Sequence, residues 1–189
     1  MCRSLKYFVT LSLTVSLFWA CAAHNCSAAN PVSFKTAYGA MEFTFPPGWF
    51  QNPEKHPYDL QCFSPDEQMN TGVFVYLKVD LAADATPHDI LDFQVNDMRS
   101  KRRNFTELAA ENRVAADGKT LTSVAYTGEK GMSRYVYRFT LIEFTDDPSQ
   151  IAVALQVAIP GRWQKSEPVL DAITRSVRSL HQPPPFPPK

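Results

Sequence analysis

Apolar and polar residues alternate along Met41–Phe45, and this short stretch sets the pattern for much of the chain. Its three apolar residues fall on one side of an extended backbone, and Glu42 and Thr44 fall on the other. A period of two residues is typical of a β-strand with one buried face. Pro46-Pro47-Gly48 ends the strand, because proline cannot donate to a sheet ladder and glycine suits a turn. Trp49 follows, and we expect it to fill the edge of the core.

The same alternation predicts further strands. In Thr71–Val79, apolar and aromatic side chains fall on both faces, so both faces of the sheet are expected to be covered. Turn residues at Asp117-Gly118, Gly128–Gly131 and Asp146–Ser149 separate the later strands. The predicted strands are Val32–Thr36, Met41–Phe45, Leu60–Phe63, Thr71–Val79, Phe105–Arg113, Lys119–Tyr126, Arg134–Thr145 and Ile151–Ile159.

Two segments change to a helical period. Thr86-Pro87-His88-Asp89 predicts a helix start, with Thr86 as the N-cap, proline in the first position and Asp89 as its reciprocal partner. An apolar stripe follows, and this helix is predicted to end near Arg102. A second helix is predicted to open at Ser166-Glu167-Pro168 and to carry its apolar face as far as Leu180.

These elements predict one α+β domain over residues 32–180. Sequential strands joined by short turns are antiparallel, and each amphipathic helix needs a sheet face to cover. We therefore expect a single antiparallel β-sheet of about seven to eight strands with helices packed on its faces, an α/β/α sandwich.

The N-terminus has the layout of a secretory signal peptide, assigned to residues 1–21. Arg3 and Lys6 precede an apolar stretch that is short for a membrane span, and small residues follow it. Phe18-Trp19-Ala20-Cys21 resembles a bacterial lipobox, with large aromatic residues where small aliphatic ones are usual. Ordinary cleavage after Ala22, Ala28 or Ala29 is the alternative, and the sequence leaves both open. Both predict an exported protein, periplasmic or anchored in the membrane through Cys21, with residues 22–31 as a tether.

The cysteines depend on where the leader is cut. If Cys26 remains, an oxidising compartment permits a disulfide with Cys62. If cleavage follows Ala28, Cys62 is alone in an apolar run, which is typical of a buried small side chain.

Charge argues against one class of partner. Lysine plus arginine and aspartate plus glutamate each number 19, so the formal net charge is zero, and removing the leader leaves a mildly acidic protein. A nucleic-acid partner is not expected, because such domains usually carry a basic excess. The one basic cluster, Arg99–Arg103, is interpreted as a solvated helix end, with a contact to phosphate or anionic lipid as the alternative.

The sequence contains no recognisable catalytic or metal-binding motif. Its four histidines have no ligand spacing, and H-E-x-x-H, C-x-x-C and G-x-S-x-G are absent. We therefore predict no catalytic residue, cofactor or metal. A weak candidate binding site is a pocket lined by Trp49, Tyr58, Trp163 and the 51–59 loop.

Residues 181–189 form a proline-rich tail that cannot join the sheet. Proline fixes φ and lacks an amide hydrogen, so polyproline II or disorder is expected. Such a tail is either a disordered terminus without a partner or a segment that docks into an aromatic-lined groove of a partner.

The order of elements between Phe34 and Leu180 resembles the PsbP-like fold. The shared features are the opening hairpin that ends in Phe45-Pro46-Pro47-Gly48-Trp49, the helix at 86–102, the long central hairpin and the closing helix. The group includes an extrinsic photosystem II subunit, a Ran-binding nuclear import factor and DcrB-like exported proteins and lipoproteins. The resemblance implies a non-enzymatic binding, assembly or stabilising module of the envelope, with an unknown envelope protein as its partner. A small-ligand carrier or an enzyme using the pocket near Trp49 and Trp163 is the alternative.

Overall fold

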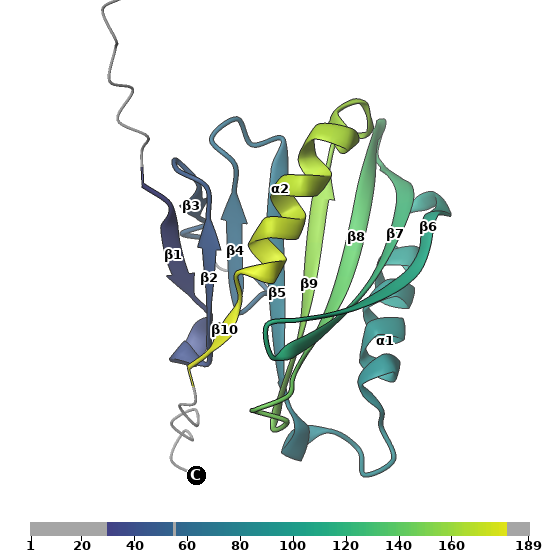
Figure 1. The fold of residues 1–189 in the computed structure, drawn as a ribbon. Helices are drawn as coiled ribbons and strands as arrows, with labels where there is room; N and C mark the ends of the chain where they lie inside the picture. The colour runs from purple at the N-terminus through teal and green to yellow at the C-terminus, as the bar shows by residue number, and fades with distance from the viewer. Residues whose placement is uncertain (1–29, 55, 181–189) are drawn as a thin grey trace, which may run out of the picture.

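A seven-stranded antiparallel sheet forms the centre of the molecule (Figure 1). The computed structural model describes residues 30–54 and 56–180. The strand order is β3-β4-β5-β9-β8-β7-β6, and every neighbouring pair runs antiparallel. The strands are β3 (Phe50–Gln51), β4 (Leu60–Phe63), β5 (Met69–Leu77), β6 (Arg103–Ala116), β7 (Lys119–Lys130), β8 (Ser133–Phe144) and β9 (Gln150–Ala158).

A second, three-stranded sheet joins the two ends of the described chain. It consists of β1 (Val32–Lys35), β2 (Met41–Phe45) and β10 (Arg178–Ser179), in the order β1-β2-β10. The predicted hairpin is confirmed as β1 and β2, but it pairs with the chain's last strand and not with the central sheet. Leu180 donates its amide hydrogen to the Ala40 carbonyl at 3.0 Å, which extends this pairing by one residue.

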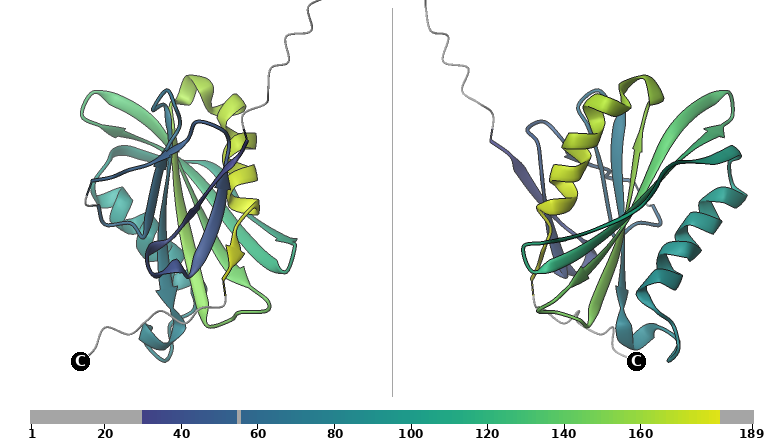
Figure 2. Two further views of the ribbon diagram at one scale, coloured as in Figure 1. Left: turned by 90° about the vertical axis from the view of Figure 1, so that its left-hand side faces the viewer. Right: turned by 45° about the vertical axis from the view of Figure 1, so that its right-hand side comes forward.

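The two helices cover opposite faces of the central sheet (Figure 2). Side chains of β9 alternate between two cores: Ala152 and Ala154 lie in the core beneath α2 (Trp163–Arg175), and Val153 and Leu155 lie in the core beneath α1 (Pro87–Ser100). The small sheet packs on the α2 side, where Met41, Phe43 and Phe45 enter the core. The predicted α/β/α layering is therefore confirmed, with the small sheet as an addition to one layer.

The start of α1 is the one predicted from sequence. The Thr86 side chain accepts from the Asp89 amide at 3.2 Å, and the Asp89 carboxylate accepts from the Thr86 amide at 2.7 Å. Ile90, Leu91 and Val95 are buried against the sheet. Both orphan donors at the helix start are satisfied, which fixes where the helix begins.

Two predicted boundaries in the sheet are wrong. β5 runs over Met69–Leu77 rather than 71–79, because Lys78–Asp80 form a 3₁₀ turn (η2) that leaves Val79 78% exposed. Gly128 is not a turn residue: it lies inside β7, and a Cβ there would meet the Phe105 ring at 2.8 Å. The turn is made by Gly131, whose φ of 62° favours glycine.

The second helix begins earlier than predicted. A 3₁₀ turn at Pro160–Arg162 (η3) runs directly into α2, so the helix starts at Trp163 and not at Ser166. Pro168 therefore lies inside the helix rather than at its first turn. No described helix is long and apolar enough to cross a membrane.

Candidate functional site

Trp49 lies in the core and not on a binding surface. Its side chain is 4% exposed, and its ring centroid is 5.3 Å from that of Phe45. It belongs to the core beneath α2, where it follows the turn at the end of β2. The position matches the structural role predicted from the proline-glycine turn.

Tyr58 lies on the opposite side of the central sheet. Its ring packs on the bare backbone of Gly72, where a Cβ would come within 2.5 Å of the ring, and it contacts Phe74 with a centroid distance of 4.8 Å. Burial raises the pKa of its hydroxyl above the ordinary value. Tyr58 packs with the α1 core, whereas Trp49 and Trp163 pack with the α2 core. The structure does not bring the three aromatic residues into one pocket, because the sheet separates Tyr58 from the two tryptophans.

Trp163 does line a surface hollow of about 320 Å³ at the start of α2. Leu108, Val136, Pro160 and Trp163 supply the apolar part of its wall, and Thr127 supplies a hydroxyl. Arg162, Gln164 and Lys165 add polar groups to the same hollow. An apolar wall with a few polar groups is the usual composition of a binding site.

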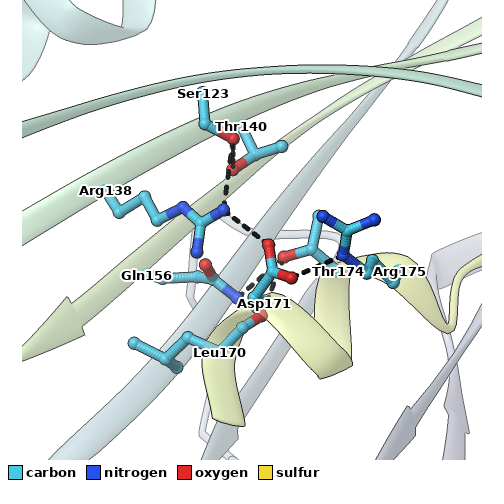
Figure 3. A network of polar contacts seen from close by, with 8 residues as sticks. All are labelled: Ser123, Arg138, Thr140, Gln156, Leu170, Asp171, Thr174 and Arg175. Atoms are coloured by element: carbon cyan, nitrogen blue, oxygen red, sulfur yellow. Dashed lines mark hydrogen bonds and ion pairs between the residues drawn. The ribbon is translucent and has the colours of Figure 1, made fainter. Parts of the chain in front are cut away.

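A polar network lies between α2 and the sheet, further along the same helix (Figure 3). Arg138 of β8 donates to the Asp171 carboxylate at 2.9 Å, and Arg175 donates to the other oxygen of Asp171. Gln156 of β9, fully buried, donates to the Leu170 carbonyl at 2.7 Å. These bonds connect one face of α2 to two adjacent strands.

The one carboxylate of this network, Asp171, is paired with two arginines. Burial alone would raise the pKa of Asp171, but the hydrogen bonds from Arg175 and Arg138 outweigh it and hold the pKa below its ordinary value. This Arg–Asp pair is partly buried, and breaking it leaves one charge unpaired between the helix and the sheet. We therefore assign the network to positioning α2, which in turn places Trp163 at the hollow.

The predicted basic cluster at the end of α1 is partly engaged with aromatic rings. The Arg99 guanidinium lies 5.8 Å from the ring centroids of both Phe105 and Tyr126, and Arg102 donates to the Tyr137 hydroxyl at 2.7 Å. Cations held over aromatic faces in this way are stabilised by the ring quadrupole. Part of the cluster therefore fixes the α1 end on the sheet.

A second cleft, of about 260 Å³, lies where α1 begins. His88 is 3.8 Å from Asp92 and 3.7 Å from Glu111, and Arg113 is 3.9 Å from Glu143. The His88–Glu111 contact links α1 to β6 at the sheet edge, and the Arg113–Glu143 contact links β6 to β8. Within residues 30–54 and 56–180, no three His, Cys, Asp or Glu side chains are placed to hold a metal ion.

Cys62 is a buried thiol with no sign of reactivity. It is fully buried in the α2 core, and burial raises its pKa to about 12. The thiolate is the nucleophilic form, so Cys62 is inert at neutral pH. Cys21 and Cys26, the signal peptide, residues 22–29 of the tether and the proline-rich tail lie outside the described residues.

The architecture is that of a central antiparallel sheet covered by a helix on each face. Comparison with solved structures identifies this arrangement as the PsbP-like fold. Cyanobacterial PsbP (CyanoP) from Synechocystis sp. PCC 6803 is 15% identical, with a TM-score of 0.60 over 80% of this chain and 93% of that one. LpqN of Mycobacterium tuberculosis, described as involved in cell envelope biogenesis, is 10% identical, with a TM-score of 0.58 over 78% and 90%. The Saccharomyces cerevisiae Ran-binding protein Mog1p is 15% identical, with a TM-score of 0.55 over 80% and 96%.

At these identities the likeness concerns the fold. No family model matches the sequence, and no curated protein matches it.

Sequence reasoning missed the network beneath α2. Arg138 and Gln156 stand inside strongly apolar strands, and only the pairing of β8 with β9 makes them neighbours. An arginine and a glutamine in otherwise apolar strands are the one signal that could have indicated it, since buried polar groups require partners.

Proposed function

We propose that the chain is an exported cell-envelope protein that serves as a binding or assembly module and not as an enzyme. The leader-like residues 1–21 and the cysteine at position 21 support export and acylation. The fold is shared by a yeast protein described as Ran-binding and by a mycobacterial protein described as involved in cell envelope biogenesis. Both descriptions favour binding and assembly as the use of this fold here.

The hollow beside Trp163 is the observation that carries a binding function. It is open, it has an apolar wall, and the network beneath α2 holds its main aromatic residue in place. Tryptophan and arginine are enriched among the residues that contribute most to binding when a partner covers them and excludes water, and Trp163 and Arg162 both line this hollow. We assign the contact with an envelope partner to this hollow.

Site-directed photocrosslinking in the native envelope tests the assignment. A photoreactive residue replaces Gln164, which is exposed and lines the hollow, and the matched control replaces Phe93, which is 63% exposed on α1. We expect one defined adduct from position 164 that is absent from position 93 and weakened by Trp163→Ala. Equal adducts from both positions, or none from position 164, would contradict the proposal.

A small-ligand carrier is the second candidate, favoured by the size of the same hollow. Its volume of about 320 Å³ lies at the lower end of the range for small-molecule sites, roughly 300–1,000 Å³. Native mass spectrometry of protein purified from its host would then show a bound mass that Trp163→Ala removes. A ligand-free wild-type spectrum would exclude this candidate.

Export and acylation have their own test. The intact mass of the mature protein should lack Met1–Trp19 and should match a diacylglyceryl group on Cys21. A mass without lipid would leave the export proposal standing and remove the anchor.

A further inference from the structure

The antiparallel topology gives the domain two ends, and the described chain begins at one of them. β1 starts at the upper end in Figure 1, where η3, the start of α2 and the β7–β8 turn also lie (Figures 1 and 2). The α1–β6 connection lies at this end as well, because Arg103 pairs with Glu129 near the end of β7. We call this the tether end.

Exposed apolar side chains gather at the tether end. Met132, at the tip of the β7–β8 turn, is 102% exposed, Leu108 is 46% exposed and Ile159 is 39% exposed. A fully exposed methionine at a turn tip contributes nothing to packing of the domain, and burying such a side chain elsewhere is favourable. Val79 and Phe93 are exposed too, but Val79 lies in η2, which follows the other end of β5, and Phe93 lies in the middle of α1.

Cations surround these apolar groups. Lys130 and Arg134 flank Met132 in the turn, and Arg162 and Lys165 flank Trp163; all four are exposed. Lys101 and Arg103 add to them at the α1–β6 connection. Lysine and arginine on either side of an apolar tip are suited to binding an anionic lipid bilayer, whose interior is apolar and whose surface is negatively charged.

Some of these cations have acidic partners, but the balance stays positive. Lys101 pairs with Asp97, Arg103 with Glu129, and Arg162 with Asp66. Glu67 in the β4–β5 turn and Glu167 near the start of α2 are further exposed acids, so the six cations named here face five acids. Among the described residues, neither Lys130 nor Lys165 forms an ion pair, and Arg134 donates to the Thr127 hydroxyl at 3.0 Å.

The connections at the opposite end are mostly acidic, although η2 also exposes Lys78. Its connections expose Asp80 and Asp84 before α1, Asp117 in the β6–β7 turn and Asp146 in the β8–β9 turn. The full chain has a formal net charge of zero, but its charges are unevenly distributed: the tether end of the domain is cationic and the far end is anionic. Such a charge distribution orients a protein in the field of a charged surface.

We propose that the β7–β8 turn at the tether end is a lipid-facing surface, with Met132 inserted into the interface of an anionic bilayer, while the neighbouring hollow beside Trp163 contacts the envelope partner. This rests on the proposed envelope location. A chain from Cys21 to Asn30 spans at most about 30 Å, so an acylated Cys21 would hold this end close to the membrane. Met132 enters the boundary between head groups and acyl chains, while Lys130 and Arg134 contact lipid phosphates. The anionic far end is repelled by the anionic head groups and points away from the membrane.

Vesicle co-sedimentation tests the surface without the anchor. The protein beginning at Ala22 keeps every described residue and lacks Cys21, so acylation plays no part. We expect it to bind phosphatidylcholine vesicles that contain phosphatidylglycerol and to lose binding as salt is raised. Met132→Asp should lower the partition at least about tenfold, because a methionine burial is lost. Lys130→Gln should lower it about fivefold on the anionic vesicles and leave neutral vesicles unaffected.

Val79→Asp is the matched control, since Val79 is an apolar residue at the far end, 78% exposed, and gains the same charge. It should bind like the parent protein. Equal vesicle binding of Met132→Asp and Val79→Asp would overturn the proposal. A second contrary result is that Met132→Asp loses binding to intact envelopes but keeps binding to vesicles, because this would indicate a protein partner. Unchanged circular dichroism of both variants excludes a folding effect. The mass of the exported protein reports separately on the anchor, so failure of the proposed function is distinguishable from failure of this inference.

Discussion

Replacing Trp49 by alanine should test whether the turn after β2 locks the small sheet onto the main core. The side chain is 4% exposed, contacts Phe45 at a centroid distance of 5.3 Å and belongs to the core beneath α2. Truncating a buried tryptophan costs about 3–5 kcal/mol through lost burial and the cavity that remains. The aromatic pair adds to the loss, so we expect about 4 kcal/mol.

For a domain of this size, that loss corresponds to a fall in Tm of roughly 8–16 °C. Urea denaturation followed by far-UV circular dichroism measures it directly. Phe50→Ala is the control: Phe50 is the next residue, is 39% exposed and stacks on Phe63 at the surface, so about 1 kcal/mol is expected. If the two variants lose the same free energy of unfolding, Trp49 is not the core residue described above.

Four further changes test other parts of the structure. Thr86→Ala removes the capping box of α1 and should cost about 0.5–2 kcal/mol in denaturation experiments; an unchanged midpoint would show that the cap contributes nothing. Gly72→Ala places a Cβ 2.5 Å from the Tyr58 ring and should cost about 1–3 kcal/mol, whereas a neutral effect would mean that the ring moves freely. Cys62, in a protein whose other cysteines are replaced, should react with a thiol reagent at neutral pH only after denaturation, because burial raises its pKa to about 12. The Asp171 pKa is held below its unfolded value of 3.8, so its stabilising effect is full above that pH and is lost as pH falls through the lower folded value. Asp171→Asn should therefore show a smaller loss of stability below pH 3.8 than the parent protein, and parallel acid profiles would contradict this.

Local patterns predicted the elements whose signals are local. The alternation of Met41–Phe45 and the capping box at Thr86 and Asp89 depend on neighbouring residues, and both are confirmed. The pattern Ser166-Glu167-Pro168 predicts the start of the second helix too late, because Pro168 lies inside the helix and not in its first turn. A 3₁₀ turn that feeds directly into a helix removes the usual start signal, since no side chain caps the helix at Arg162.

The candidate site depended on contacts between distant residues, which periodicity does not reveal. Trp49, Tyr58 and Trp163 were grouped because they are large and lie near turns. Which face of the sheet each residue joins is decided by strand register, and a shift of one residue reverses it. The hollow beside Trp163 also requires Leu108, whose side is set by the register shifts between β6 and β7.

The charged ends of the domain, by contrast, correspond to a charge pattern in the sequence, and this pattern can be interpreted once the topology is known. From η2 onward, successive connections lie at alternate ends of the molecule, and the sign of their charge alternates in the same way. The acidic connections are at 80–84, 117 and 146–147. The basic connections are at 99–103, 130–134 and 162–165. Over the full sequence the 19 basic and 19 acidic residues cancel, which is why net charge argued only against a nucleic-acid partner. In an antiparallel fold the same alternation places like charges together at each end, where they add. The exposed Met132 stands in one of the basic connections, so the apolar and cationic parts of the tether end come from a single turn.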